Sequence, residues 1–133
     1  EATRKNELVS AFGLDGESAK PLRHLSGGTR QKVSAVTAFM FEPEMLVLDE
    51  PTAGLDPVSA GLLKDLIGEE RKRGHTILLT SHIMSEIEEL SDMVAFIQDG
   101  RIGFSGSAQA IRTRTGAHNL ERAIGKLMTA KVA

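Results

Sequence analysis

The amino-acid sequence predicts an α/β fold in which helices flank a largely parallel sheet. Three short and mainly apolar runs, at 45–48, 76–80 and 93–97, are typical of parallel strands that are buried on both faces. Segments with apolar residues at helical spacing lie before, between and after these runs. Alternation of the two patterns indicates this fold class, and 133 residues are enough for one compact domain.

Two helices are predicted before the first strand. Leu8 and Phe12 have the spacing of a short amphipathic helix near the N-terminus. Ser26 is a suitable N-cap for a second helix, and Glu42-Pro43 ends it, because a proline disfavours helical geometry in the preceding residue. The buried face of this second helix is predicted to contain Val33, Val36, Thr37, Met40 and Phe41.

A third helix is predicted after the first strand. Asp56 is expected to cap it, with Pro57 at its first position. The basic run Arg71-Lys72-Arg73, followed by Gly74, is typical of a solvated helix end. The buried face of the helix is predicted to contain Leu62, Leu63, Leu66 and Ile67.

The second half of the sequence places helices on either side of a hairpin. One helix is predicted from Ser81 or His82 through Leu90. The dipeptide Asp99-Gly100 predicts a tight turn, so the strand after it turns back antiparallel at a sheet edge. A final amphipathic helix is indicated by Leu120, Ala123, Ile124, Leu127 and Met128.

The composition argues against several classes of function. The 16 Lys and Arg residues and 18 Asp and Glu residues give a net charge of -2, which offers no overall attraction to nucleic acid or to an anionic membrane. Cysteine is absent, which excludes disulfides and thiolate metal sites. No apolar run approaches the ~20 residues of a membrane-spanning helix. The sequence is therefore predicted to be soluble and cytoplasmic.

The acidic pair Asp49-Glu50 directly follows the first predicted strand. Phosphoryl transfer from a nucleotide needs a carboxylate to hold Mg²⁺, and a second one often orients or deprotonates the attacking water. Adjacent residues at the rigid end of a strand can divide these roles. Taken alone, the same pattern also fits a solvated strand end.

Three segments, in this order, resemble motifs of one family. Leu25–Gln31 (LSGGTRQ) resembles the signature motif of ABC ATPases, with Thr29 where Gln is commoner. Met45–Pro57 (MLVLDEPTAGLDP) resembles their Walker B strand and D-loop, and Thr80-Ser81-His82 resembles their switch-histidine segment. The sequence is thereby identified as resembling the C-terminal part of an ABC transporter ATP-binding subunit. It looks most like ABC-2 type exporters, and it is similar to the ATPases of nitrous-oxide reductase copper maturation and of gliding motility.

The resemblance implies a P-loop NTPase (RecA-like) fold with part of the ABC helical subdomain. Residues 1–42 would be the end of that subdomain with the signature helix, 43–106 the C-terminal half of the ATPase core, and 107–133 a C-terminal helical tail. No G-x-x-x-x-G-K-[ST] motif is present, so the P-loop strand is expected to be absent. Since that strand would lie between those at 76–80 and 93–97, we expect a divided sheet with exposed apolar edges.

The resemblance also implies a role for each candidate site residue. Asp49 would bind Mg²⁺ through water, Glu50 would be the general base or position the attacking water, and His82 would contact the γ-phosphate of ATP. Across a head-to-tail dimer, the γ-phosphate of ATP on the second subunit would be bound by Ser26, Gly27 and Gly28. Asp56 would lie at that dimer interface.

The function implied is that of an ATP-hydrolysing motor subunit of an ABC exporter, with ATP and Mg as cofactors. Its partners would be a second ATPase subunit and a transmembrane permease, and no nucleic acid is expected. It would be located at the cytoplasmic face of the cell membrane. Without a P-loop, this chain alone is expected to be inactive. Two alternatives stay open: a soluble ABC ATPase of DNA repair or translation, and a truncated, non-catalytic dimerisation module.

Overall fold

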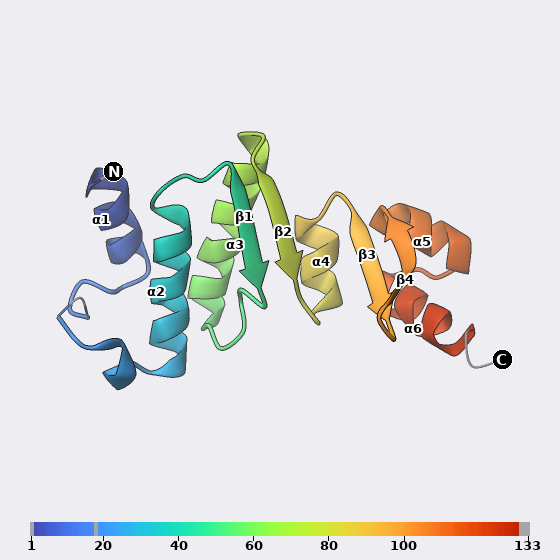
Figure 1. Cartoon of the computed structure of the whole chain (residues 1–133), viewed down its shortest axis with the longest axis horizontal. Coiled ribbons are helices and arrows are strands. Elements are labelled where there is room, and N and C mark those ends of the chain that lie inside the picture. Colours follow the sequence, from blue (N-terminus) through green and yellow to red (C-terminus); the bar gives the residue numbers. More distant parts are fainter. Residues whose placement is uncertain (1, 18, 131–133) are drawn as a thin grey trace. The chain divides into compact units, whose positions relative to one another are not determined.

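The structure, a computed structural model, describes residues 2–17 and 19–130 (Figure 1). The chain divides into two compact units, Glu1–Thr80 and Ser81–Ala133, and each unit is described by itself. The three-part division at 42/43 and 106/107 stays a prediction.

The first unit is built on a pair of parallel strands. Its elements are α1 (Ala2–Ala11), a 3-10 helix (Leu22–His24), α2 (Gly27–Phe39), β1 (Met45–Asp49), α3 (Pro57–Lys72) and β2 (Thr76–Thr80). In the β1–β2 pair, Leu46 lies opposite Ile77 and Asp49 lies opposite Thr80. Helix α3 connects the strands and packs beside them (Figure 1). The predicted parallel strand–helix–strand unit is therefore present.

The core of the first unit confirms most of the predicted helix faces. The least exposed apolar residues of this core are Phe12, Phe39, Leu46, Leu63 and Ile67. The predictions for Thr37 and Phe41 were wrong, because Thr37 is exposed, α2 ends at Phe39 and Phe41 is 62% exposed. Phe39, at 0% exposure, takes the buried position instead.

The prediction that the strands at 45–48, 76–80 and 93–97 are buried on both faces was also wrong for the described chain, because Val47, Leu78 and Ile97 are exposed. Leu46 and Leu48 are buried, whereas Val47 between them is 68% exposed. Leu78, which pairs with Val47, is exposed on the same side. Helices of this unit therefore cover one face of the strand pair, and an apolar face remains open.

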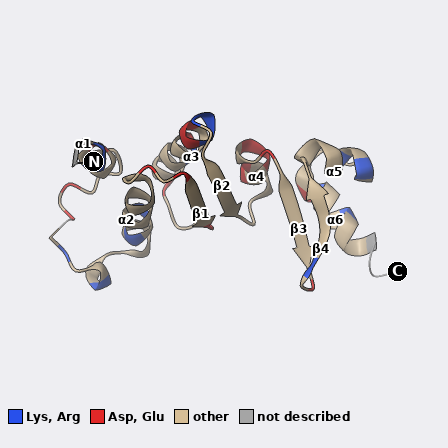
Figure 2. Ribbon diagram, turned by 45° about the horizontal axis from the view of Figure 1, so that its top comes forward, with Lys and Arg blue, Asp and Glu red and all other residues tan. Residues whose placement is uncertain are grey.

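The C-terminal end of α3 carries acidic and basic residues side by side (Figure 2). Arg71, Lys72 and Arg73 are exposed, as predicted, but Glu70 before them is completely buried. Its carboxylate accepts hydrogen bonds from Arg4 Nη2 at 2.6 Å and Arg73 Nη1 at 3.1 Å. His75 Nδ1 lies 2.7 Å from its other oxygen. A buried charge is tolerated because partners of opposite charge and hydrogen bonds compensate it.

The second unit packs three helices with a β-hairpin. Its elements are α4 (Met84–Leu90), β3 (Val94–Gln98), β4 (Arg101–Gly106), α5 (Ala108–Thr115) and α6 (Leu120–Ala130). Asp99 and Gly100 have φ values of 50° and 70°, which confirms the predicted tight turn, and β4 returns antiparallel to β3. Phe104, Ile111, Leu120 and Ala123 form the buried cluster.

Among the described residues, the strands form two separate sheets of two strands each, β1–β2 and β3–β4. This confirms the expectation of a divided sheet. In the same part of the chain, no helix combines the length and apolar character that crossing a bilayer requires.

Candidate functional site

The acidic pair lies where β1 ends, and one residue of β2 contacts both acids. The Thr80 hydroxyl donates a short hydrogen bond to Asp49 Oδ1. The backbone N–H of Glu50 lies within hydrogen-bonding distance of the Thr80 carbonyl oxygen, at 3.1 Å, and of its hydroxyl oxygen, at 3.2 Å. Pairing of the two strands therefore sets the position of Asp49 and of the Glu50 backbone.

Glu50 has a left-handed backbone, with φ of 45°. This region is unfavourable for a residue with a Cβ, and Pro51 further restricts the residue before it towards extended geometry. Such a conformation costs on the order of 1–3 kcal/mol and persists only where surrounding contacts enforce it. The N–H of Ala53 closes the turn by donating to the Glu50 carbonyl oxygen at 3.0 Å. The reversal redirects the chain immediately after the acids.

The predicted anion site lies at the N-terminus of α2. Ser26 caps the helix, and its hydroxyl accepts a hydrogen bond from the Thr29 N–H at 3.1 Å. The hydroxyls of Ser26 and Thr29 lie 2.7 Å apart, so Thr29 has a polar partner although Gln is commoner there. Gly27 begins the helix and is exposed. A helix N-terminus with a hydroxyl and exposed backbone N–H groups is suited to an anion.

The first two turns of α2 lie directly against the loop that follows Glu50. A Cβ on Gly28 would lie only 2.9 Å from the Gly54 carbonyl oxygen, so glycine is needed for this approach. Gln31 Nε2 donates to the Pro51 carbonyl oxygen at 2.8 Å. Ser26, Gly27 and Gly28 thus belong to the same unit as Asp49 and Glu50. Helix α2, which they begin, packs against the loop that follows Glu50.

Asp56 is bound within its own chain. Its carboxylate caps α3 by accepting from the Ser59 N–H at 2.9 Å and the Ser59 hydroxyl at 2.8 Å. Lys32 Nζ lies 2.9 Å from Asp56 Oδ2. The Ser59 N–H hydrogen bond, followed by the hydrogen bond from Lys32, holds the pKa of Asp56 well below its usual range. The predicted cap is confirmed, and the interface role of Asp56 stays a prediction.

His82 belongs to the second unit, where its side chain is exposed. It lies between β2 and α4, next to Ser81, whose hydroxyl accepts from the Ile83 N–H at 3.0 Å. The structure therefore groups six of the seven predicted site residues, Ser26, Gly27, Gly28, Asp49, Glu50 and Asp56, in one unit.

Sequence reasoning assigned no role to Thr80, Gln31 or Lys32, which contact the predicted residues. Thr80 could have been found from the sheet, because the ends of parallel neighbours meet at one edge. The Gln31 and Lys32 contacts join segments about 20 positions apart and depend on helix packing, which the sequence does not display.

The oxygen atoms at the end of β1 suit Mg²⁺. No cluster of three or more His, Cys, Asp or Glu residues occurs among the described residues, so a cage made by the protein alone is absent there. Mg²⁺ prefers oxygen ligands and usually keeps several waters, with one or two carboxylates and substrate phosphates as its other ligands. The exposed Asp49 carboxylate fits that pattern.

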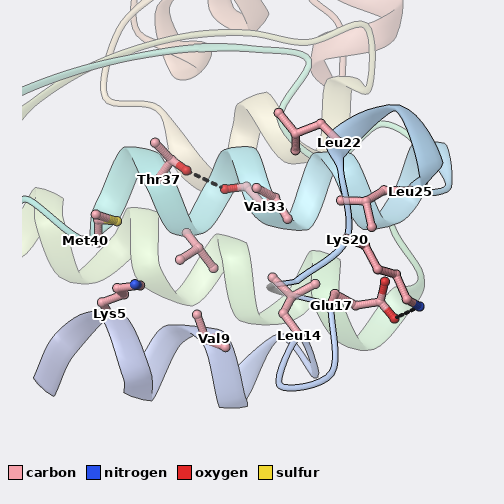
Figure 3. A pocket seen from close by; sticks show the side chains of 11 residues that line it. Lys5, Val9, Leu14, Glu17, Lys20, Leu22, Leu25, Val33, Thr37 and Met40 are labelled. Carbon is pink, nitrogen blue, oxygen red and sulfur yellow. Dashed lines mark hydrogen bonds and ion pairs between the residues drawn. The ribbon is translucent and has the colours of Figure 1, made fainter. Parts of the chain in front are cut away.

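A mainly apolar pocket of about 380 Å³ lies between α1, α2 and the segment that joins them (Figure 3). Lys20 and Glu17 form an ion pair of 2.9 Å at this pocket. None of the predicted site residues lines it, and Leu25 is the lining residue next to Ser26. Its lining consists of Lys5, Val9, Leu14, Glu17, Lys20, Leu22, Leu25, Val33, Val36, Thr37 and Met40.

Comparison with known proteins gives consistent results. Residues 1–53 match the family described as "ABC transporter". The chain is 37% identical over 108 residues to the energy-coupling factor transporter ATP-binding protein of Methanocaldococcus jannaschii, an alignment that covers 81% of this chain and 39% of the relative. It is 43% identical over 96 residues to a fluoroquinolones export ATP-binding protein of Mycobacterium tuberculosis, covering 72% of this chain and 32% of the relative.

A third relative is the daunorubicin resistance ATP-binding protein of Streptomyces coeruleorubidus, at 33% identity over 89% of this chain and 37% of the relative. A solved ATP-binding subunit of an ABC transporter superposes with a TM-score of 0.90 at 31% identity, covering 96% of this chain and 54% of that chain. The chain thus spans less than two-fifths of the length of these three curated relatives and about half of the solved one.

Proposed function

Because the chain belongs to the ABC transporter ATP-binding family, we propose that it supplies the Walker B and signature parts of an ATPase that drives export. The observation that carries the proposal is the joining of three elements in one unit. Two adjacent acids end β1, Thr80 bonds to both of them, and the glycine-opened helix α2 lies against their loop.

Each acid has a separate role in this proposal. Asp49 holds Mg²⁺ through water, and the bound ion neutralises charge on the phosphates of ATP. Glu50 orients the attacking water or accepts its proton, and the rigid strand end keeps that carboxylate in place. His82 donates a hydrogen bond to a γ-phosphate oxygen.

The anion site at Ser26, Gly27 and Gly28 acts on a second ATPase subunit. Its hydroxyl and backbone N–H groups lie at the start of α2 and bind the γ-phosphate of ATP held by that subunit. Asp56 lies at the same interface, so the two subunits form a head-to-tail dimer.

Export is favoured over other ABC functions by the names of the relatives, which include fluoroquinolones export and daunorubicin resistance proteins. The motor would work with a transmembrane permease at the cytoplasmic face of the membrane. The narrower likeness to copper-maturation and gliding-motility ATPases stays a prediction.

The test uses the longer ATPase, meaning this chain preceded by a half that carries a P-loop. We expect Glu50→Gln to lower kcat by about 100-fold or more, because a general base is lost, while ATP still binds. Glu44→Gln, at the opposite end of β1, is the matched control and should hydrolyse ATP normally. This chain alone should show no turnover. Unimpaired hydrolysis by Glu50→Gln would remove Glu50 as the catalytic carboxylate.

A further inference from the structure

Gln31 is a polar residue of α2 that has no role in the proposed function, yet it contacts the loop of the catalytic acid. Its Nε2 atom donates to the Pro51 carbonyl oxygen at 2.8 Å. The same atom lies 3.5 Å from the Glu50 carbonyl oxygen, which is too long for a strong hydrogen bond. Gln31 is half-buried and lies one turn beyond Gly28.

The contact matters because the backbone of Glu50 is in an unfavourable conformation. A left-handed residue before a proline relaxes towards extended geometry unless both sides of it are held. On its N-terminal side, the N–H of Glu50 is held by Thr80. On its C-terminal side, Pro51 has no N–H to donate, so its carbonyl oxygen is the backbone atom by which another element can hold it.

The structure assigns Gln31 as a positioning residue that fixes the Glu50 carboxylate by holding the Pro51 carbonyl oxygen. The inference rests on the proposed function. Gln31 does not touch the reacting atoms and acts through the backbone of Glu50 and Pro51. Ser26 caps the helix that contains Gln31. A displacement of the anion site would therefore also move Gln31, which supports Glu50 in the same chain.

The test compares three replacements of Gln31 in the longer ATPase. Gln31→Met keeps the length and helix preference of the side chain but cannot donate. Gln31→Glu keeps length and polarity and also lacks a donor. Gln31→Lys restores a donor that can reach the carbonyl oxygen. Ser34→Met, at an exposed position of the same helix, is the matched control.

We expect kcat to fall about 10-fold or more in Gln31→Met and Gln31→Glu, because small displacements of a catalytic group have large effects on rate. KM for ATP should change by less than about two-fold, because the binding groups remain. Gln31→Lys should retain kcat within about three-fold of the parent, and Ser34→Met should match the parent. Backbone N–H groups at 52–55 should exchange with deuterium faster in the two donor-free variants.

Equal kcat in the parent and both donor-free variants overturns the inference, as does a loss in Gln31→Lys as large as in Gln31→Glu. If Gln31→Met unfolds, the comparison of Gln31→Glu with Gln31→Lys decides the matter, since both are polar. A parent protein that neither binds nor hydrolyses ATP refutes the proposed function itself, and the two failures are therefore distinct.

Discussion

Arg4 and Glu70 lie 66 positions apart in the sequence, and their side chains meet at a distance of 2.6 Å between Nη2 and Oε1. The Glu70 side chain is 1% exposed and that of Arg4 is 18% exposed. This ion pair joins α1 to the end of α3, the helix that positions the β1–β2 pair. Stability of the first unit should therefore depend on a charge that is far from the candidate site.

We expect Glu70→Ala to lower the free energy of unfolding by about 3 kcal/mol, because the half-buried Arg4 would lose its buried partner and keep only the exposed Glu42. Glu69→Ala, at the exposed neighbouring position, should change it by less than about 0.5 kcal/mol. Urea unfolding followed by circular dichroism measures both values. Equal effects of the two substitutions would show that the buried ion pair contributes no more to the free energy of unfolding than an exposed glutamate does.

Asp56 should make stability depend on pH in the acidic range. Its pKa in the folded chain is held below the ordinary value of 3.8, so its stabilising contribution is complete above that value and is lost as the pH falls towards the lowered pKa. Asp56→Asn keeps a residue able to cap α3 but removes the charge that Lys32 contacts. The variant should unfold at lower urea concentration than the parent at pH 7, and the difference should shrink below pH 3.8. A difference that stays constant from pH 7 to pH 3 contradicts the assignment.

Gly28→Ala should disturb the contact between α2 and the loop after Glu50. The added methyl group would lie 2.9 Å from the backbone oxygen of Gly54, and overpacking of this kind costs about 1–3 kcal/mol. Gly27→Ala meets open space and is the matched control, with stability unchanged or slightly higher. Thermal unfolding of the two variants compares them directly. A Gly28→Ala variant as stable as the control would mean that the loop moves away freely.

The open face of the β1–β2 pair should make the isolated chain associate. Val47 and Leu78 are adjacent, exposed and apolar there, and such a face gains free energy when it is removed from water. Val47→Thr should raise the dissociation constant for self-association, measured by analytical ultracentrifugation. Val58→Thr makes the same change at an exposed position of α3 and should leave association as it is. A monomeric parent chain at all concentrations would count against this face as an association surface.

The sequence predicts an element well when the signals for it are local. The cap at Asp56 with Pro57 predicted the start of α3, and Asp99-Gly100 predicted the hairpin turn, because a few adjacent residues determine each geometry. Burial of Glu70 was missed, since its partner Arg4 belongs to another helix. The face of β1 that stays open was missed as well, because an apolar pattern shows which residues prefer burial and does not show what covers them.

The same distinction applies to the candidate site. Asp49, Glu50 and the Ser26–Gly28 segment could be predicted because their residue types and order are characteristic. The contacts of Gln31 and Lys32 could not, because each depends on how α2 packs against a loop. The left-handed backbone of Glu50 was also missed, as nothing in a glutamate before a proline favours it.

Thr80 makes the arrangement of the acids depend on the register of the β1–β2 pair. Asp49 lies opposite Thr80, so a slip of β2 by one position that brings Leu79 opposite Asp49 would replace the Thr80 hydroxyl with an apolar side chain. A misaligned strand pair could retain its backbone ladder and much of its secondary structure while leaving both acids unsupported. Folding yield judged by helix and strand content would therefore overestimate the fraction of molecules in which Thr80 holds both acids.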